Sequence, residues 1–197
     1  EFDAVIIRSS TELSGAAIEE GSKGALKVIA RAGVGVDNID LTAASHFGII
    51  VVNSPTVSTT AVAELTIGLL LAAARNIPAA CRTISEGKWC KSEYIGYELG
   101  GKNLGLVGYG RIARRVAQIA HGFGMNIHTI DPYLDKSSLE NYVTTHDNIL
   151  SLASSVNHLS LHCELSRDTR NIVDKGVIQA LTNGAGPKVL VNCARGG

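Results

Sequence analysis

Short apolar runs alternate along this chain with stretches of helical periodicity. The runs lack alternating polar positions, which is typical of parallel strands covered by helices on both faces. We expect strands over residues 4–7, 28–30, 49–52, 104–107, 127–130, 158–161 and 189–192. Helical patterns occupy residues 14–20, 41–46, 58–75, 112–120 and 175–181, whereas residues 78–101 form a looser, more polar region. Strands that alternate with helices predict parallel α/β sheets.

The stretch from Asn103 to Asp131 predicts a dinucleotide site. An apolar strand runs directly into the turn G-Y-G-R-I-A at residues 108–113, and a helical run follows. Gly108 permits a tight turn, Gly110 lets the backbone approach a pyrophosphate, and the small Ala113 lets the helix pack on the strand. The helix N-terminus offers unpaired N–H groups to phosphates. A glycine turn without a ligand is the alternative, but strand, turn, helix, second strand and acid stand in the required order.

Asp131 ends the second strand of this unit, 131 − 110 = 21 residues after the second glycine. A carboxylate at that place accepts both hydroxyls of the adenine ribose and repels a 2′-phosphate. We therefore expect NAD rather than NADP as the cofactor. The fold class predicted from this unit is α/β with a Rossmann-type doubly wound parallel sheet.

Two other loops carry candidate chemistry. The loop at residues 31–38 places Gly33 and Gly35 just after a strand, where backbone N–H groups can cradle a carboxylate. Arg195 follows the last strand at its carboxyl end, where ligands bind in open α/β sheets and a guanidinium can grip a carboxylate. A tight strand-to-helix connection and a structural surface arginine are the alternatives.

Composition and charge narrow the function classes. The 197 residues are 45% hydrophobic and 18% charged, and 18 Lys and Arg balance 18 Asp and Glu. No basic run favours nucleic acid or a membrane surface, and the longest apolar run, residues 65–74, is too short to span a bilayer. The four cysteines form no C-x-x-C pair, which favours reduced thiols and a cytoplasmic location. No metal site is predicted.

Five ordered motifs resemble the D-isomer-specific 2-hydroxyacid dehydrogenases. They are R-A-G-V-G-V-D-N-I-D-L at residues 31–41, V-A-E at 62–64, G-L-V-G-Y-G-R-I at 105–112, L-S-L-H at 159–162 and N-C-A-R-G-G at 192–197. The resemblance covers essentially the whole chain. It implies a partial substrate-binding domain at residues 1–52, flavodoxin-like and smaller, and an NAD-binding Rossmann domain at residues 53–197 that lacks its C-terminal part.

The resemblance also implies a role for each matched residue. On the cofactor side these are Gly108, Gly110, Arg111, Ile112, Asp131, Cys163, Cys193, Ala194 and Val34. On the substrate side they are Arg8, Ser9, Arg31, Gly33, Val34 and Gly35, with Lys91 to help bind a phosphate. Arg195 would be the catalytic arginine that holds the substrate carboxylate and polarises the carbonyl.

The chain departs from the family pattern at two positions. Glu164 stands where a proline is usual after the L-S-L-H strand, and Ser58 where an asparagine is common. The catalytic Glu and His of the family lie downstream of the Arg-Gly-Gly motif. Because the chain opens in mid-strand without an initiator Met and stops at Gly197, we expect a fragment of a longer protein, inactive by itself. His162 is the tempting substitute for the absent histidine, but a strand-end histidine is more often a structural hydrogen bonder.

Within the family, the N-C-A-R-G-G wording and residues 86–89 are most similar to the branch that oxidises 3-phospho-D-glycerate in serine biosynthesis. A glyoxylate or hydroxypyruvate reductase is one alternative, and an NAD(H)-sensing corepressor resembling the C-terminal-binding proteins is another. The implied partner is a small 2-hydroxy acid, with no nucleic acid and no membrane. The intact protein is expected to form a homodimer or homotetramer.

Overall fold

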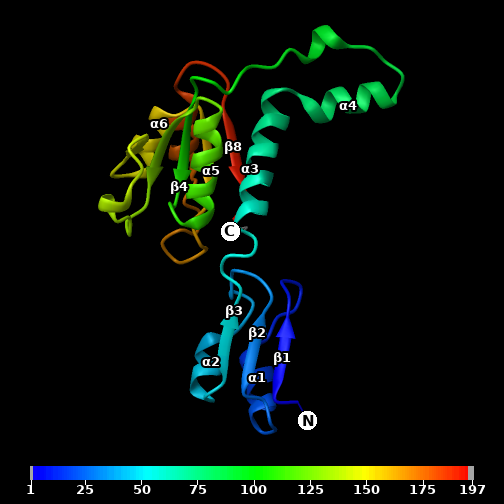
Figure 1. The fold of residues 1–197 in the computed structure, drawn as a ribbon, viewed down its shortest axis with the longest axis vertical. Coiled ribbons are helices and arrows are strands. Elements are labelled where there is room, and N and C mark those ends of the chain that lie inside the picture. Colours follow the sequence, from blue (N-terminus) through cyan, green and yellow to red (C-terminus); the bar gives the residue numbers. More distant parts are fainter. Residues whose placement is uncertain (1, 195–197) are drawn as a thin grey trace. The chain divides into compact units, whose positions relative to one another are not determined.

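A computed structural model describes residues 2–194 of the chain. It divides into two compact units, with Thr59 the last residue of the first and Thr60 the first of the second. The dividing point therefore lies at the start of a helix, after the connecting loop, whereas the sequence interpretation placed a boundary between residues 52 and 53. Each unit contains one parallel sheet (Figure 1).

The first unit is a three-stranded parallel sheet with two helices. Its elements are β1 (Ala4–Ile7), α1 (Gly15–Ser22), β2 (Val28–Arg31), α2 (Leu41–His46) and β3 (Ile50–Asn53), and the strand order is β1-β2-β3. Both helices start at side-chain caps, since Ser14 accepts from the N–H of Ala17 and Asp40 from that of Ala43. Ile18 and Ile29 are buried between helices and sheet.

The second unit holds a five-stranded parallel sheet in the order β6-β5-β4-β7-β8. Its elements are α3 (Thr59–Ala74), α4 (Ile77–Ser85), η1 (Lys91–Tyr94), β4 (Asn103–Val107), α5 (Arg111–Gly122), β5 (Asn126–Ile130), η2 (Lys136–Ser138), β6 (Val143–Thr145), α6 (Ile149–Ser155), β7 (His158–Leu161), α7 (Lys175–Thr182) and β8 (Val189–Asn192). The chain first builds outward from β4 to β6 and then returns to build β7 and β8 on the other side. The strand order thus reverses between β4 and β7, where ligands bind in open α/β sheets.

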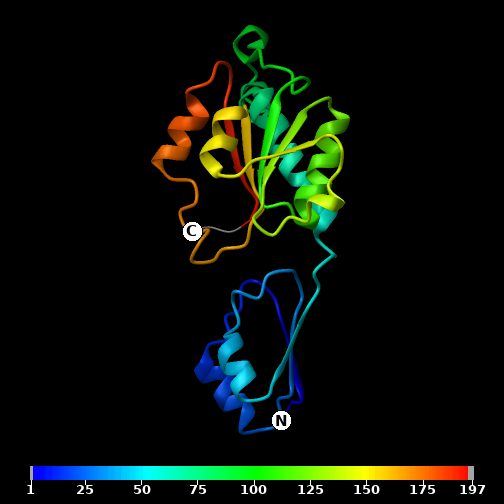
Figure 2. The same cartoon turned by 90° about the vertical axis from the view of Figure 1, so that its left-hand side faces the viewer.

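Helices cover both faces of this sheet. Leu70 of α3 and Val116 of α5 belong to one buried cluster with Leu104 of β4. Leu152 of α6 and Val177 of α7 belong to a second cluster on the opposite face, where Figure 2 shows these helices in yellow and orange. The predicted α/β class and Rossmann-type sheet are confirmed.

The structure differs from the sequence interpretation mainly between residues 77 and 101. α4 fills the first part of the region expected to be loose, with Pro78 in its first turn, where a missing N–H is tolerated. α4 and the loop after it project from the end of α3 away from the five-stranded sheet (Figure 1). No single helix within residues 2–194 is long and apolar enough to cross a membrane; only α3 and α4 taken together, with a bend of 68° between them, meet that requirement.

Candidate functional site

The glycine turn after β4 is built against the end of β7. Gly108 has a φ of +85°, and its N–H donates to the carbonyl of Ile130 at 2.8 Å. A Cβ at Gly108 would lie 2.9 Å from the backbone nitrogen of Cys163 and 3.0 Å from its Cα. Both the backbone conformation and the close approach therefore require glycine here.

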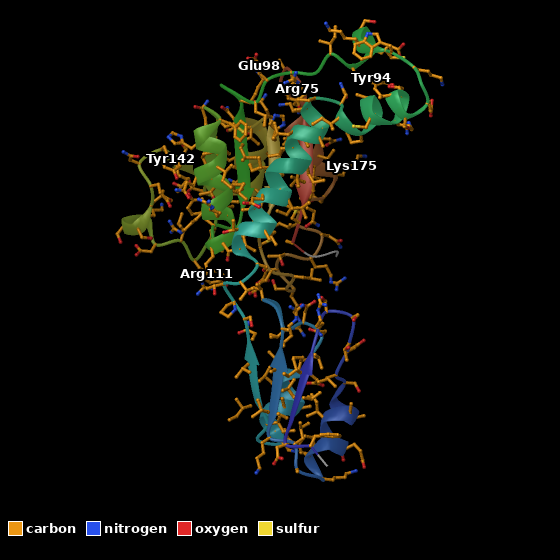
Figure 3. The ribbon with its side chains drawn as sticks, turned by 45° about the vertical axis from the view of Figure 1, so that its right-hand side comes forward. Arg75, Tyr94, Glu98, Arg111, Tyr142 and Lys175 are labelled. Carbon is orange, nitrogen blue, oxygen red and sulfur yellow. The ribbon has the colours of Figure 1, made fainter. Side chains whose placement is uncertain are left out.

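The second glycine faces open space. Gly110 is the N-cap of α5 and provides no side-chain cap, and a Cβ built on it would meet nothing within 4 Å. The first N–H groups of α5, including those of Arg111 and Ile112, are therefore left for an external acceptor, and the helix dipole favours an anion there. Ala113 is fully buried and lets α5 pack closely on β4. This arrangement fits a pyrophosphate. Figure 3 shows Arg111 at the first turn of α5, at one end of the second unit, whereas Glu98 lies at the other end.

Asp131 is fixed beside this turn by two backbone donors. One carboxylate oxygen accepts the N–H of Tyr109 at 2.8 Å, and the other accepts the N–H of Tyr133 at 2.9 Å. Each oxygen retains lone-pair capacity for a further donor such as a ribose hydroxyl. The carboxylate is thus oriented at the end of β5, one strand away from the reversal point.

Cys163, Cys193 and Ala194 leave the sheet on adjacent strands. β7 and β8 pair with Leu161 opposite Asn192, so the residues that follow lie next to one another. Cys163 and Ala194 line a cavity of about 240 Å³. Burial raises the pKa of the Cys163 thiol, and the charges of Asp131 and Glu164 raise it further, so the thiol stays protonated. Cys193 instead packs with the α3 and α5 cluster on the other face.

Glu164, which replaces the usual proline, is exposed on the wall of the same cavity. His162 precedes Glu164 by two residues and is bonded to neighbouring residues of the sheet. Its backbone N–H donates to the Val107 carbonyl at 2.8 Å, and its ring Nε2 lies 2.9 Å from the Ser160 hydroxyl. Burial lowers the pKa of His162 to about 4, so its imidazole is neutral at pH 7. These contacts favour the structural interpretation of this histidine.

A buried arginine marks the first unit. Arg31 ends β2 and is only 7% exposed. One NH donates to the Ala32 carbonyl at 3.3 Å, and Nε has no hydrogen-bond partner among residues 2–194. A Cβ on Gly33 would coincide with the Arg31 guanidinium, so that glycine makes room for the charge. An incompletely bonded buried cation of this kind fits an anionic ligand.

The other substrate-side residues gather at the same edge of the three-stranded sheet. β1 and β2 pair with Ile7 opposite Arg31, so Arg8 and Ser9 emerge beside the loop that contains Val34 and Gly35. That loop is fixed by two asparagines that the sequence analysis did not single out. Asn38 donates to the Arg8 carbonyl at 3.1 Å and to the Thr11 carbonyl at 2.6 Å, and Asn53 donates to the Val34 carbonyl at 2.6 Å. The sequence signal available for them was position, because Asn38 ends the loop at residues 31–38 and Asn53 follows the strand expected at residues 49–52, and asparagine side chains often bond backbone groups at such places.

Two further predicted site residues are Lys91 and Arg195. Lys91 starts η1, whose last residue, Tyr94, lies in the projecting segment near Arg75 and Glu98, at the end of the second unit opposite Arg111 (Figure 3). Arg195, the predicted catalytic residue, lies outside the described residues. Among residues 2–194, no group of three or more His, Cys, Asp or Glu side chains is placed to hold a metal ion.

Comparison with known proteins matches residues 67–197 to the family described as D-isomer specific 2-hydroxyacid dehydrogenase, NAD binding domain. D-3-phosphoglycerate dehydrogenase of Methanocaldococcus jannaschii is 46% identical over all of this chain and 37% of its own length. Hydroxypyruvate reductase of Thermotoga maritima is 42% identical over all of this chain and 62% of its own length. The apo structure of D-lactate dehydrogenase from Escherichia coli superposes with a TM-score of 0.84, at 31% identity, over 98% of this chain and 60% of that one.

The chain thus spans little more than a third of the phosphoglycerate dehydrogenase to which it is similar. The family match begins within α3 and includes the glycine turn, Asp131 and the ends of β7 and β8. On this match and the geometry of the turn, the chain belongs to the D-isomer specific 2-hydroxyacid dehydrogenases and carries their NAD-binding domain.

Proposed function

We propose that the intact protein is an NAD-dependent dehydrogenase that oxidises 3-phospho-D-glycerate at C2 to 3-phosphohydroxypyruvate, the first step of serine biosynthesis. The observation that carries this proposal is the buried guanidinium of Arg31 beside the edge where Arg8 emerges. The guanidinium groups of Arg31 and Arg8 at this edge provide more positive charge than one substrate carboxylate would neutralise. A substrate that carries both a carboxylate and a phosphate would use them both.

The chain's own residues divide the work. The turn at residues 108–113 and the N-terminus of α5 hold the pyrophosphate, and Asp131 accepts the ribose hydroxyls. Bound NAD supplies the hydride acceptor. The N–H groups of the loop containing Gly33 and Gly35 orient the substrate carboxylate. Arg195 holds that carboxylate and polarises the substrate oxygen, and the proton at this oxygen is assigned by family resemblance to a histidine downstream of Gly197.

Discrimination between phosphorylated and unphosphorylated substrates tests the proposal. We expect the intact protein to show kcat/KM roughly ten- to a hundredfold higher for 3-phosphoglycerate than for glycerate, because losing charge-assisted bonds to a phosphate costs roughly 1.5–3 kcal/mol. Arg8→Gln should narrow that ratio, whereas Arg82→Gln, the same change at an exposed position on α4, should leave it unchanged.

The reductase alternative predicts the opposite result. It is supported by the similarity to the Thermotoga maritima hydroxypyruvate reductase. A higher kcat/KM for hydroxypyruvate than for phosphohydroxypyruvate would contradict the phosphoglycerate proposal and favour the reductase. Negligible turnover of every acid, together with tight NADH binding, would favour the corepressor alternative.

We further propose that the intact protein is a cytoplasmic homodimer or homotetramer. Large apolar side chains are exposed along α3, α4 and the loop after them, namely Leu65, Leu69, Ile77, Ile84 and Trp89. Apolar surface of this extent favours burial against another chain. All four cysteines are free, which supports a reducing compartment. Light scattering should give a dimer or tetramer mass, and Ile84→Asp should shift it towards the monomer; a monomeric wild type would contradict this assembly.

A further inference from the structure

Tyr109, between the two glycines of the turn, is attached to both ends of the loop that follows β5. Its backbone N–H donates to Asp131 at the start of that loop at 2.8 Å. Its hydroxyl donates to the Glu140 carboxylate at the far end of the loop at 2.9 Å. The Tyr109 side chain is only 3% exposed, in the cluster that also contains Leu134 and Leu139. Tyr109 of the turn therefore links the two ends of the stretch at residues 131–140, hereafter the Asp131 loop.

Arg114 of α5 completes this link. Its NH1 lies 3.1 Å from each oxygen of Glu140 and also donates to the Ser138 carbonyl at 3.1 Å. Its guanidinium carbon lies 4.8 Å from the centre of the Tyr109 ring. The ion pair is 31% exposed on each side, so solvent screens it less than the exposed pairs elsewhere in the chain. Glu140 thus joins the glycine turn, the first turns of α5 and the Asp131 loop.

The protonation states suit these bonds. Burial alone would raise the pKa of Glu140, but hydrogen bonds from its own backbone, Tyr109 and Arg114 outweigh burial and lower that pKa. Burial raises the pKa of Tyr109, and the neighbouring Glu140 raises it further. The carboxylate accepts and the phenol donates over the working pH range of a dehydrogenase.

We propose that Glu140 is a positioning residue for the cofactor, acting through Tyr109 and Asp131 to hold the glycine turn and the ribose-binding carboxylate in one fixed arrangement. A loop ordered before binding spares the ligand the cost of ordering it. Apart from η2, the stretch between Asp131 and Glu140 has no regular structure, and it exposes Tyr133, so the polar link at its far end fixes its position together with the packing of Leu134 and Leu139. This inference rests on NAD(H) binding at the turn and does not depend on which acid is oxidised.

Binding and kinetic measurements on the intact protein test the inference. In Glu140→Gln, we expect the Kd for NADH and for ADP-ribose to rise by roughly five- to twentyfold, because the link to Arg114 and Tyr109 is weakened. KM for NAD should rise with kcat nearly unchanged. Tyr109→Phe should also weaken the binding of both NADH and ADP-ribose. The double variant should bind them no more weakly than Glu140→Gln does, since both substitutions remove the same link. Glu86→Gln, which breaks the exposed pair with Lys88, serves as the control and should change nothing.

The possible outcomes separate this inference from the cofactor assignment. A wild-type protein that fails to bind NADH would contradict the proposed function itself. Wild-type binding together with unchanged Kd values in Glu140→Gln, even at a lowered Tm, would overturn only the positioning role. If Glu140→Gln fails to fold, Arg114→Lys keeps the charge but loses the two-oxygen contact. An Arg114→Lys protein with wild-type NADH affinity would then overturn the inference.

Discussion

The backbone of Cys163 occupies the space that a side chain on Gly108 would need. A Cβ at Gly108 would lie 2.9 Å from the Cys163 nitrogen, and the glycine has a φ of +85°. The end of β7 therefore packs directly against the turn that ends β4. This packing lies at the reversal point of the sheet, where ligands bind in open α/β sheets.

Gly108→Ala should therefore abolish NADH binding and lower the free energy of unfolding by more than the left-handed backbone alone requires. The matched control is Gly101→Ala, because Gly101 has a φ of +71° with nothing within 4 Å of a built Cβ. Gly101→Ala should cost roughly 1–2 kcal/mol and leave NADH affinity intact. Chemical denaturation and NADH titration of both variants measure the difference. Equal stability losses with NADH binding retained in both would show that the Cys163 contact is unimportant.

Gly33→Ala should displace the Arg31 guanidinium, which occupies the place of the new methyl group. We expect KM for the hydroxy acid to rise about tenfold or more, since a charge-assisted contact is lost, while NADH affinity stays near wild type. Gly48→Ala is the control in the same unit, with a φ of +67° and open space around it. Steady-state kinetics compare the two. A similar KM in both variants would mean that Arg31 does not bind the substrate.

Two buried histidines should make the protein less stable in mild acid. Burial lowers the pKa of His158 to about 4, with Lys188 and Lys102 adding to the effect, and burial lowers that of His162 to about 4. Between this value and the ordinary 6.5, the unfolded chain binds protons that the folded chain does not. Stability is therefore full above about pH 6.5 and falls as the pH drops towards 4, by on the order of 1–2 kcal/mol per histidine at pH 5.

Urea unfolding at pH 7.5 and pH 5 measures this loss. His158→Phe removes the titrating group and keeps an aromatic ring against Tyr97, which stacks on His158 with ring centres 5.7 Å apart. The variant should lose less stability between the two pH values than the wild type. An unchanged loss would show that His158 titrates normally in the folded protein.

Arg195 is the residue of this chain whose loss we expect to harm the chemistry most. In the sequence it comes directly after Cys193 and Ala194, the two residues that follow β8. Lysine cannot reproduce the two parallel hydrogen bonds of a guanidinium to a carboxylate. In the intact protein, Arg195→Lys should raise KM for the acid and lower kcat, for a loss of roughly ten- to a hundredfold in kcat/KM, with NAD affinity nearly unchanged. A lowered Tm with near wild-type kcat/KM would instead assign Arg195 a structural role.

The parts of the fold that the sequence predicts are those where burial leaves a local pattern. Residues 189–191 are three consecutive apolar residues, and residues 158–161 carry two leucines; the segments expected at 158–161 and 189–192 form β7 and β8 with those bounds. The glycine turn is readable because its conformation and its approach to Cys163 each demand a residue without a side chain. α4 is missed because none of its residues is buried, and β6 because a three-residue edge strand is too short to show a period.

Side-chain partners distant in sequence leave no such pattern. Tyr109 and Glu140 are 31 residues apart, and nothing in either segment indicates that the phenol and the carboxylate meet. The burial of Arg31 is likewise hidden, since an arginine at a strand end is usually exposed. Predicting these contacts requires the packed structure, because they depend on how α5 and the loops settle on the sheet.

The most direct test of the cofactor site is calorimetric titration of the intact protein with NADH and NADPH. Because the Asp131 carboxylate is oriented beside the turn by the N–H groups of Tyr109 and Tyr133, a 2′-phosphate would meet a fixed negative charge. We expect NADH to bind roughly ten- to a hundredfold more tightly than NADPH, which corresponds to about 1–3 kcal/mol. Asp131→Asn, which keeps the acceptor oxygen but removes the charge, and Asp131→Ala should both narrow the gap. Equal or tighter binding of NADPH by the wild-type protein would contradict the account.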